Sequence, residues 1–303
     1  MTDAPSKYLR PDVLARLTGL ELRARRVVEG FVSGQHRSPY RGYSVEFAEH
    51  REYVPGDDIR HIDWRVYGRA DRFFIKQYEE ETNLRTYLLV DCSASMRYPE
   101  HPEGGRLTKF EYAATAAASL AFLLTHQQDA VGLTLFDHEV RTELPPASSP
   151  AHLRGLLSAM EAARLEAPSR MADVFTSLAG RLRRRGLVVL ISDLLADPDE
   201  VIHGLDLLRF HRHDVVVFHL LDQDERTFPF QDNTLFEGLE RPDQQLFVDP
   251  PSLRAAYLDV LDEFVRRLRD ECVDRRIDYV DLTTAEPLDV VLRRYLAARA
   301  SVR

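Results

Sequence analysis

Residues 86–97, with the sequence TYLLVDCSASMR, decide how the rest of the chain is arranged. The apolar run at 87–90 has the unbroken, β-prone character of a strand that is buried on both faces. One acid and two hydroxyl residues follow at alternate positions, Asp91, Ser93 and Ser95. We therefore expect three oxygen-bearing side chains at the carboxyl end of a strand, which is where open α/β sheets bind their ligands.

Downstream of this stretch, apolar segments alternate with amphipathic ones. We predict strands at 86–90, 130–136, 187–192, 214–220 and 277–282, and a short antiparallel edge strand at 140–144. The predicted helices are 107–126, 150–163, 173–185, 198–210, 251–275 and 287–299. Apolar strands separated by helices indicate an α/β fold, in which a mostly parallel sheet is covered by helices on both faces. Residues 223–250 break the alternation, so we expect an insertion with a small hairpin there.

Upstream, residues 1–85 are predicted to form an N-terminal region that precedes the α/β domain at 86–303. This region would contain a helix at 11–32 and a small β-rich part with strand-like segments at 45–47 and 73–77. Between those segments, charges gather around the only tryptophan of the chain, in the cluster Asp57, Asp58, Arg60, His61, Asp63, Trp64 and Arg65. The acids and the histidine could ligate a metal, but arginines balance the acids, which favours a salt-bridged structural role.

The composition is that of a globular protein with an excess of acid. The chain is 44% hydrophobic and 29% charged, and its net charge is −9. Binding to nucleic acid requires a basic surface, so we expect no nucleic-acid partner. The most apolar stretch, residues 112–124, is shorter than the roughly 20 residues that a membrane span needs. Two distant cysteines and an N-terminus without an apolar core lead us to expect a cytoplasmic protein without membrane insertion.

Further acids are predicted at the same edge of the sheet. Asp193 follows the strand at 187–192, and Asp137 follows the strand at 130–136. Carboxylates and hydroxyls are hard oxygen donors, which suit Mg²⁺ or Ca²⁺ better than zinc. On spacing alone, a structural alternative is as well supported as a cation site. In this alternative, Asp91 caps a helix or loop and the two serines bond to the backbone.

The D-x-S-x-S pattern after an apolar strand, with a later Ser-Asp pair, resembles the metal-ion-dependent adhesion site of von Willebrand factor A domains. The block EFAEHREYVPGDDIRHIDWRVYGRADRFFIKQYEEETNLRTYLLVDCSASM more specifically resembles the signature of the bacterial "domain of unknown function" family fifty-eight. The later segments LFEGLE and QLFVDP are similar to that family as well. The resemblance implies a von Willebrand factor A-like fold. It also implies metal ligation by Asp91, Ser93 and Ser95, with Asp193 acting directly or through water.

One position departs from the pattern of that site. The usual site takes a threonine from a loop between helices, and Ala172 stands in its place in the segment SRMADVFTSL. The next residue, Asp173, keeps an oxygen nearby and is the fifth candidate ligand. Because alanine cannot coordinate a cation, the site could be weakened, could use Asp173 or water, or could hold no ion.

Two functions follow from these observations. The resemblance implies a non-enzymatic protein–protein interaction module or adaptor that works with a MoxR-type AAA+ ATPase, since members of the family are often encoded beside such ATPases. The alternative is a metal-dependent hydrolase, such as a phosphatase, that uses Asp91, Asp137, Asp193 and His138. The sequence contains no G-x-S-x-G, H-E-x-x-H or P-loop motif, which favours the first function.

Overall fold

The computed structural model describes residues 19–34, 49–52, 73–77, 85–102, 104–182 and 184–301. The chain divides into two compact units, a small one at 36–83 and a large one at 1–35 and 84–303. The described part of the small unit is an antiparallel pair of strands, β1 (Glu49–Glu52) and β2 (Phe74–Gln77). Strand β2 confirms the prediction at 73–77. The predicted segment at 45–47 and the charged cluster at 57–65 lie outside the described residues.

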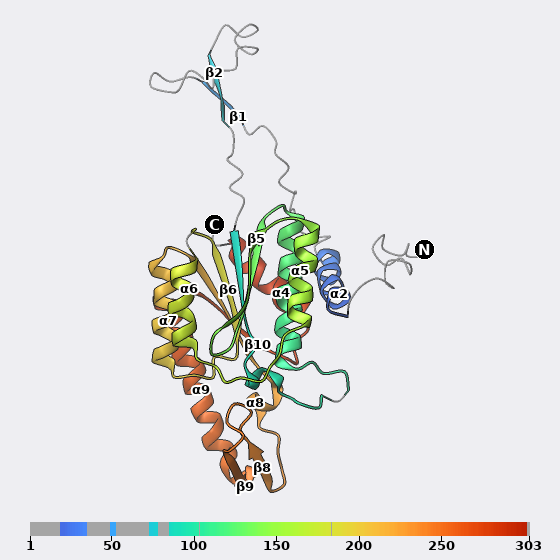
Figure 1. Ribbon diagram of the computed structural model, residues 1–303, viewed down its shortest axis with the longest axis vertical. Helices are drawn as coiled ribbons and strands as arrows, with labels where there is room; N and C mark the ends of the chain where they lie inside the picture. Colours follow the sequence, from blue (N-terminus) through green and yellow to red (C-terminus); the bar gives the residue numbers. More distant parts are fainter. Residues whose placement is uncertain are drawn as a thin grey trace, which may run out of the picture. The chain divides into compact units, whose positions relative to one another are not determined.

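The large unit is built on a six-stranded sheet in the order β10-β7-β6-β3-β4-β5 (Figure 1). Five strands run parallel, and β5 pairs antiparallel with β4 at one edge. The strands are β3 (Arg85–Asp91), β4 (Ala130–Phe136), β5 (Val140–Ala147), β6 (Leu187–Ser192), β7 (Asp214–Leu221) and β10 (Asp278–Thr283). The predicted α/β fold, its parallel strands and its antiparallel edge strand are confirmed.

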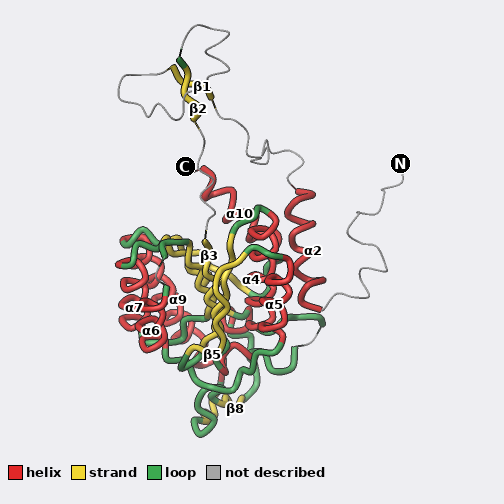
Figure 2. The backbone as a smooth tube through the Cα atoms, turned by 45° about the horizontal axis from the view of Figure 1, so that its top comes forward, coloured by secondary structure: helices red, strands yellow, loops and turns green. Residues whose placement is uncertain are grey.

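Helices cover both faces of this sheet (Figure 2). Alternate residues of β3 point to opposite faces. Leu88 and Val90 accordingly pack against α2, α4, α5 and α10, whereas Tyr87 and Leu89 pack against α6, α7 and α9. The helices are α2 (Gly19–Gly34), α4 (Lys109–His126), α5 (Pro150–Glu161), α6 (Met171–Arg181), α7 (Pro198–Phe210), α9 (Pro250–Asp274) and α10 (Leu288–Ser301).

Helix α2 groups with the large unit, whereas the prediction placed it with the small β-rich part in a separate N-terminal region at 1–85. Its buried side chains Leu20 and Ala24 join the core on the α4 side of the sheet. The backbone N–H of Leu20 also donates to Glu161 Oε1 of α5 at 3.2 Å. Burial of this apolar face is the physical reason why α2 groups with a sheet that begins some fifty residues later. The predicted start of this helix, at 11–18, lies outside the described residues.

The insertion predicted at 223–250 contains the short helix α8 (Gln223–Thr227) and the antiparallel hairpin β8 (Thr234–Glu237) and β9 (Gln245–Val248). The hairpin is confirmed, and α8 is an addition to the prediction. Four aromatic rings hold the insertion to the start of α9, namely those of Phe228, Phe230, Phe236 and Tyr257, with centroids 4.6–5.7 Å apart. The insertion follows β7 and therefore starts at the carboxyl edge of the parallel strands (Figure 1).

Candidate functional site

Acids follow four neighbouring parallel strands at the carboxyl edge of the sheet, which we call the rim. Asp91 ends β3, Asp137 follows β4, Asp193 follows β6 and Asp222 follows β7. All four are almost completely buried. Burying a carboxylate is costly unless it is paired or hydrogen-bonded. The partners of these acids therefore define what the rim can do.

Asp91 is held by hydrogen-bond donors. Its Oδ1 accepts the backbone N–H of Ser93 at 2.8 Å, and its Oδ2 accepts the hydroxyl of Ser192 at 2.6 Å. The Ser192 hydroxyl in turn accepts the backbone N–H of Leu194 at 2.9 Å. Burial, and next the charge of Asp193, raise the pKa of Asp91 to about 7. The carboxyl group of Asp91 can therefore take up a proton near neutral pH.

The two serines of the motif lie beside Asp91 and face one another. Their hydroxyl oxygens are 3.1 Å apart, and both side chains are buried. The Ser95 hydroxyl also lies close to Asp193 and helps to lower the pKa of that acid. Glu240, from the insertion, lies within hydrogen-bonding reach of both serine hydroxyls, and its Oε2 accepts the backbone N–H of Ser169 at 3.2 Å. The predicted residues Asp91, Ser93, Ser95 and Asp193 therefore form one cluster, and the insertion adds a carboxylate to it.

Asp193 is paired with a buried lysine. Lys109 Nζ lies 2.8 Å from Asp193 Oδ2 and 2.6 Å from Glu225 Oε1, and only 1% of the lysine side chain is exposed. Glu225 is positioned by the capping box of α8, in which its Oε2 accepts the backbone N–H of Asp222 at 2.7 Å. A single ammonium group thus joins β6, α4 and the insertion.

The pKa shifts in this trio follow from burial and pairing. Burial alone would lower the pKa of Lys109, but Asp193 and Glu225 outweigh it and raise that pKa. Burial alone would raise the pKa of Asp193, but Lys109 outweighs it and lowers that pKa. For Glu225, burial prevails over Lys109 and its pKa is raised. Lys109 and Asp193 therefore form a charged pair inside the protein.

The two outer acids are paired with arginines. Arg141 Nε donates to Asp137 Oδ2 at 2.6 Å, and Arg106 Nη2 donates to Asp222 Oδ1 at 2.6 Å. Both arginine side chains are more than a third exposed. Asp91 is thus the one strand-end acid of the four for which the described residues offer no paired cation.

Cys92 follows Asp91 directly but points into the core. Burial, reinforced by Asp91 and Asp137, raises the pKa of its thiol to about 12. The reactive form of a cysteine is the thiolate. Cys92 is therefore a packing residue in this structure.

A cleft of about 500 Å³ separates the rim from the insertion. Ser95 and Lys109 lie on its rim side, and Phe228, Phe236 and Glu240 lie on its insertion side. Its lining thus combines the motif with aromatic side chains and acids. The cleft is the place where a ligand or a segment of a partner would meet the D-x-S-x-S motif.

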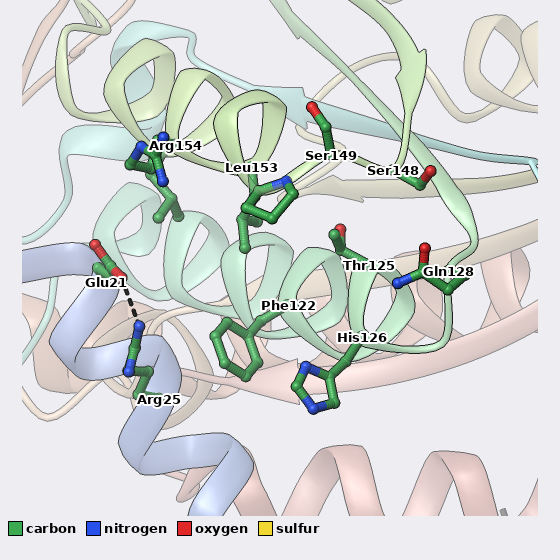
Figure 3. A pocket seen from close by; sticks show the side chains of 12 residues that line it. Glu21, Arg25, Phe122, Thr125, His126, Gln128, Ser148, Ser149, Leu153 and Arg154 are labelled. Carbon is green, nitrogen blue, oxygen red and sulfur yellow. Dashed lines mark hydrogen bonds and ion pairs between the residues drawn. The ribbon is translucent and has the colours of Figure 1, made fainter. Parts of the chain in front are cut away.

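A second hollow of about 640 Å³ lies between α2, α4 and α5 (Figure 3). Glu21 and Arg25 form an ion pair at its edge with a separation of 3.0 Å, and the guanidinium of Arg25 lies over the ring of Phe122. The polar groups that line it are spread over three helices and do not converge on a point (Figure 3). The hollow therefore lacks the clustered chemistry that distinguishes the rim.

The rim fits a divalent cation poorly. Asp173 is exposed in the first turn of α6, and no contact among the described residues joins it to the other four candidates. Thr176, one turn later, donates its hydroxyl to the carbonyl of Ala172 instead. Asp193 already holds an ammonium, and both oxygens of Asp91 accept protein donors. Within the described ranges, no group of three or more His, Cys, Asp or Glu side chains is arranged to hold a metal ion.

Sequence reasoning did not assign five residues to the site: Lys109, Ser192, Asp222, Glu225 and Glu240. A signal for Lys109 was present, because it follows Thr108 in the capping box Thr108–Glu111 and so begins a helix. The positive end of the helix dipole disfavours a cation there. A lysine in that position needs acidic partners from elsewhere, which the sequence alone could not identify.

The parallel sheet, its antiparallel edge strand and the D-x-S-x-S motif at the end of β3 define a von Willebrand factor A-like α/β domain. The sequence profile of DUF58, described as a protein of unknown function, matches residues 49–263. The chain belongs to this family. Among the described residues, no helix is both long and apolar enough to cross a membrane.

Similar proteins include the uncharacterized proteins Mb1516 of Mycobacterium bovis and Rv1480 of Mycobacterium tuberculosis. Each is 29% identical over 248 residues, which cover 80% of this chain and 76% of the relative. Among solved structures, BatB from Bacteroides thetaiotaomicron matches with a TM-score of 0.48 and 12% identity, covering 72% of this chain and 99% of that one. A von Willebrand factor type A structure from Catenulispora acidiphila matches with a TM-score of 0.42 and 12% identity, covering 74% and 43%.

Proposed function

We propose that this protein is a non-enzymatic interaction module that binds a partner protein through the rim and the insertion beside it. The observation that carries the proposal is a pair of exposed apolar side chains on one face of the hairpin, Leu235 and Phe247, which are cross-strand partners. A third exposed apolar side chain, that of Leu246, points to the opposite face. Leu235, Leu246 and Phe247 are 50%, 58% and 69% exposed. Exposed apolar side chains that gather on one element are typical of protein-binding sites.

The charge of the insertion indicates what kind of partner would fit. Residues 223–250 contain seven acids and two arginines. One of these arginines, Arg226, pairs with Asp281 outside the insertion. The apolar side chains of the hairpin therefore lie in an acidic segment. A partner whose binding surface has an apolar centre surrounded by basic residues would be complementary to it.

A MoxR-type AAA+ ATPase is the partner that we propose. The resemblance to families encoded beside such ATPases supports this choice, and an ATPase with a basic face would complement the acidic insertion. A hydrolase is the less supported alternative. Asp137 is bound to Arg141, and the Cys92 thiol is buried with a raised pKa, so neither is set up to act as a nucleophile.

The test is a binding titration against the purified MoxR-type ATPase encoded nearest to this protein, with ATP present. We expect Leu235→Ala together with Phe247→Ala, which truncates both exposed side chains on one face of the hairpin, to weaken binding roughly tenfold or more, because truncated hot-spot side chains cost this much. Phe210→Ala is the matched control. Phe210 is 82% exposed and ends α7, which leads back to the amino edge of the sheet. Failure of the wild type to bind, or equal binding by the double variant and the control, would refute the proposal.

A further inference from the structure

The environment of Lys109 is unusual for a lysine. Lys109 is the first residue of α4 and is fully buried, although most lysines in folded proteins are exposed. Taking an ammonium group out of water costs several kcal/mol unless partners compensate for the lost hydration. The positive end of the α4 dipole adds to this cost. An ammonium group that is buried at this position must therefore be paired with carboxylates that are held in fixed positions.

Two acids hold the Lys109 ammonium, and both are themselves fixed. Asp193 Oδ2 is 2.8 Å away, while Asp193 Oδ1 accepts the backbone N–H of Leu195 at 3.3 Å. Glu225 Oε1 is 2.6 Å away, while Glu225 Oε2 closes the capping box of α8. Each carboxylate therefore uses one oxygen for the backbone and the other for the ammonium. The positive charge is thus preorganised between the sheet and the insertion.

The same acid, Asp193, is the one that the D-x-S-x-S resemblance assigns to a divalent cation. A divalent cation that used Asp193 would lie next to the Lys109 ammonium and would be repelled by it. It would also find Ala172 where the resemblance calls for an oxygen, and an exposed Asp173. The donor set on the rim is therefore already satisfied by a resident positive charge.

We propose that the Lys109 ammonium is the resident cation of this rim, and that it takes the place of a divalent metal and fixes the insertion to the sheet. The site is then active as a binding surface without added metal. Its geometry depends on the Asp193–Lys109–Glu225 bridge, which links residues 84 and 116 positions apart in sequence. Metal-independent partner binding rests on the function proposed above, whereas the cation assignment itself does not.

The cation assignment is tested with Mn²⁺, whose electron paramagnetic resonance signal reports free and bound ion. We expect the wild type to bind no Mn²⁺ at millimolar concentration and to show no change of Tm with Mn²⁺, Mg²⁺ or Ca²⁺. We expect Lys109→Met to lower the Tm by roughly 10 °C, because it leaves the buried Asp193 and the partly buried Glu225 without their cation. That variant should then gain one Mn²⁺ site, and the site should disappear when Asp193→Asn is added.

The matched control is Arg106→Met, which removes a cation that pairs with Asp222 and Asp224. Asp222 is the N-cap of α8 and Asp224 lies in α8, the helix that also carries the Lys109 partner Glu225. It should bind no Mn²⁺. Binding of one Mn²⁺ by the wild type that Asp91→Ala abolishes would overturn the assignment. A folded Lys109→Met that gains no Mn²⁺ site would overturn it as well. If Lys109→Met does not fold, the wild-type titration decides the matter by itself.

Partner binding provides a second and separate readout. We expect the wild type to bind the ATPase equally well in EDTA and in Mg²⁺, with a non-hydrolysable nucleotide preloaded on the ATPase and the excess removed. Binding that is lost in EDTA and restored by Mg²⁺, while the ATPase alone is unaffected, would refute metal independence. Absence of any binding would count against the proposed function only, since the Mn²⁺ titration judges the cation assignment alone.

Discussion

Two buried acids that follow the strands on either side of β3 are stabilised in different ways. On one side Asp193 follows β6 and is paired with Lys109, and on the other Asp137 follows β4 and is paired with Arg141. Both acids are buried, but the lysine side chain is 1% exposed and the arginine side chain is 39% exposed. The Coulomb interaction of a pair is stronger where water is excluded, and so is the cost of leaving one member alone. The comparison predicts that the two pairs differ greatly in their effect on stability.

The largest effect is expected for Lys109→Met. Removal of the ammonium leaves Asp193 and Glu225 unpaired inside the protein. Because breaking a buried pair by removing one partner is strongly destabilising, we expect a loss of about 3–5 kcal/mol in the free energy of unfolding. Urea denaturation near neutral pH measures this loss. A loss below that of Arg141→Met would show that exposure does not explain the difference between the two sides.

A smaller effect is expected for Ser192→Ala. Asp91 lies between the two pairs and is stabilised by hydrogen bonds, one of which comes from the Ser192 hydroxyl at 2.6 Å. Loss of a donor to a buried carboxyl group should cost about 1.5–3 kcal/mol. Ser119→Ala is the matched control, because the Ser119 hydroxyl is also buried but donates to the carbonyl of Thr115 and not to Asp91.

The cost of Ser192→Ala should also depend on pH. The folded pKa of Asp91, about 7, lies above its ordinary value of 3.8. The stability that this carboxyl group contributes is therefore present at low pH and is lost as the pH rises through the folded value. Ser192 favours the charged form, so the variant should be more destabilised at about pH 8 than at about pH 5. An equal loss at both pH values would mean that Asp91 does not titrate in this range.

The smallest effect is expected for Arg141→Met. Its guanidinium is partly solvated, and water can replace it around Asp137. Since the guanidinium is solvated and the backbone N–H of Glu139 still donates to Asp137, we expect a loss of about 1 kcal/mol or less, and less still in high salt. The measurement is the same denaturation at low and high ionic strength. A loss that is large and insensitive to salt would show that Asp137, like Asp193, depends on an ion pair that water cannot replace.

Much of the architecture could be predicted from the sequence because it depends on local patterns. The bounds of β4 and β6 could be predicted from their apolar runs, since strands that are buried on both faces carry few polar residues, here Thr134 in β4 and Ser192 at the end of β6. Asp91 and Asp193 could be placed together for a similar reason. Parallel neighbouring strands end at the same edge, so an acid after each of them must reach that edge.

The rest could not be predicted because it depends on contacts between distant segments. Glu225 contacts Lys109, which is 116 positions away in the sequence. Helix α2 packs in the core of the large sheet although the small unit lies between them in the sequence. Burial sets the cost of an unpaired charge, and no local pattern shows whether a given lysine will be buried. The sequence by itself thus determined the sheet and the position of the D-x-S-x-S motif at its edge. Only the tertiary structure decided that an ammonium group from α4 pairs with Asp193, an acid that the family resemblance assigns to a metal, because burial and pairing are properties of the packed chain.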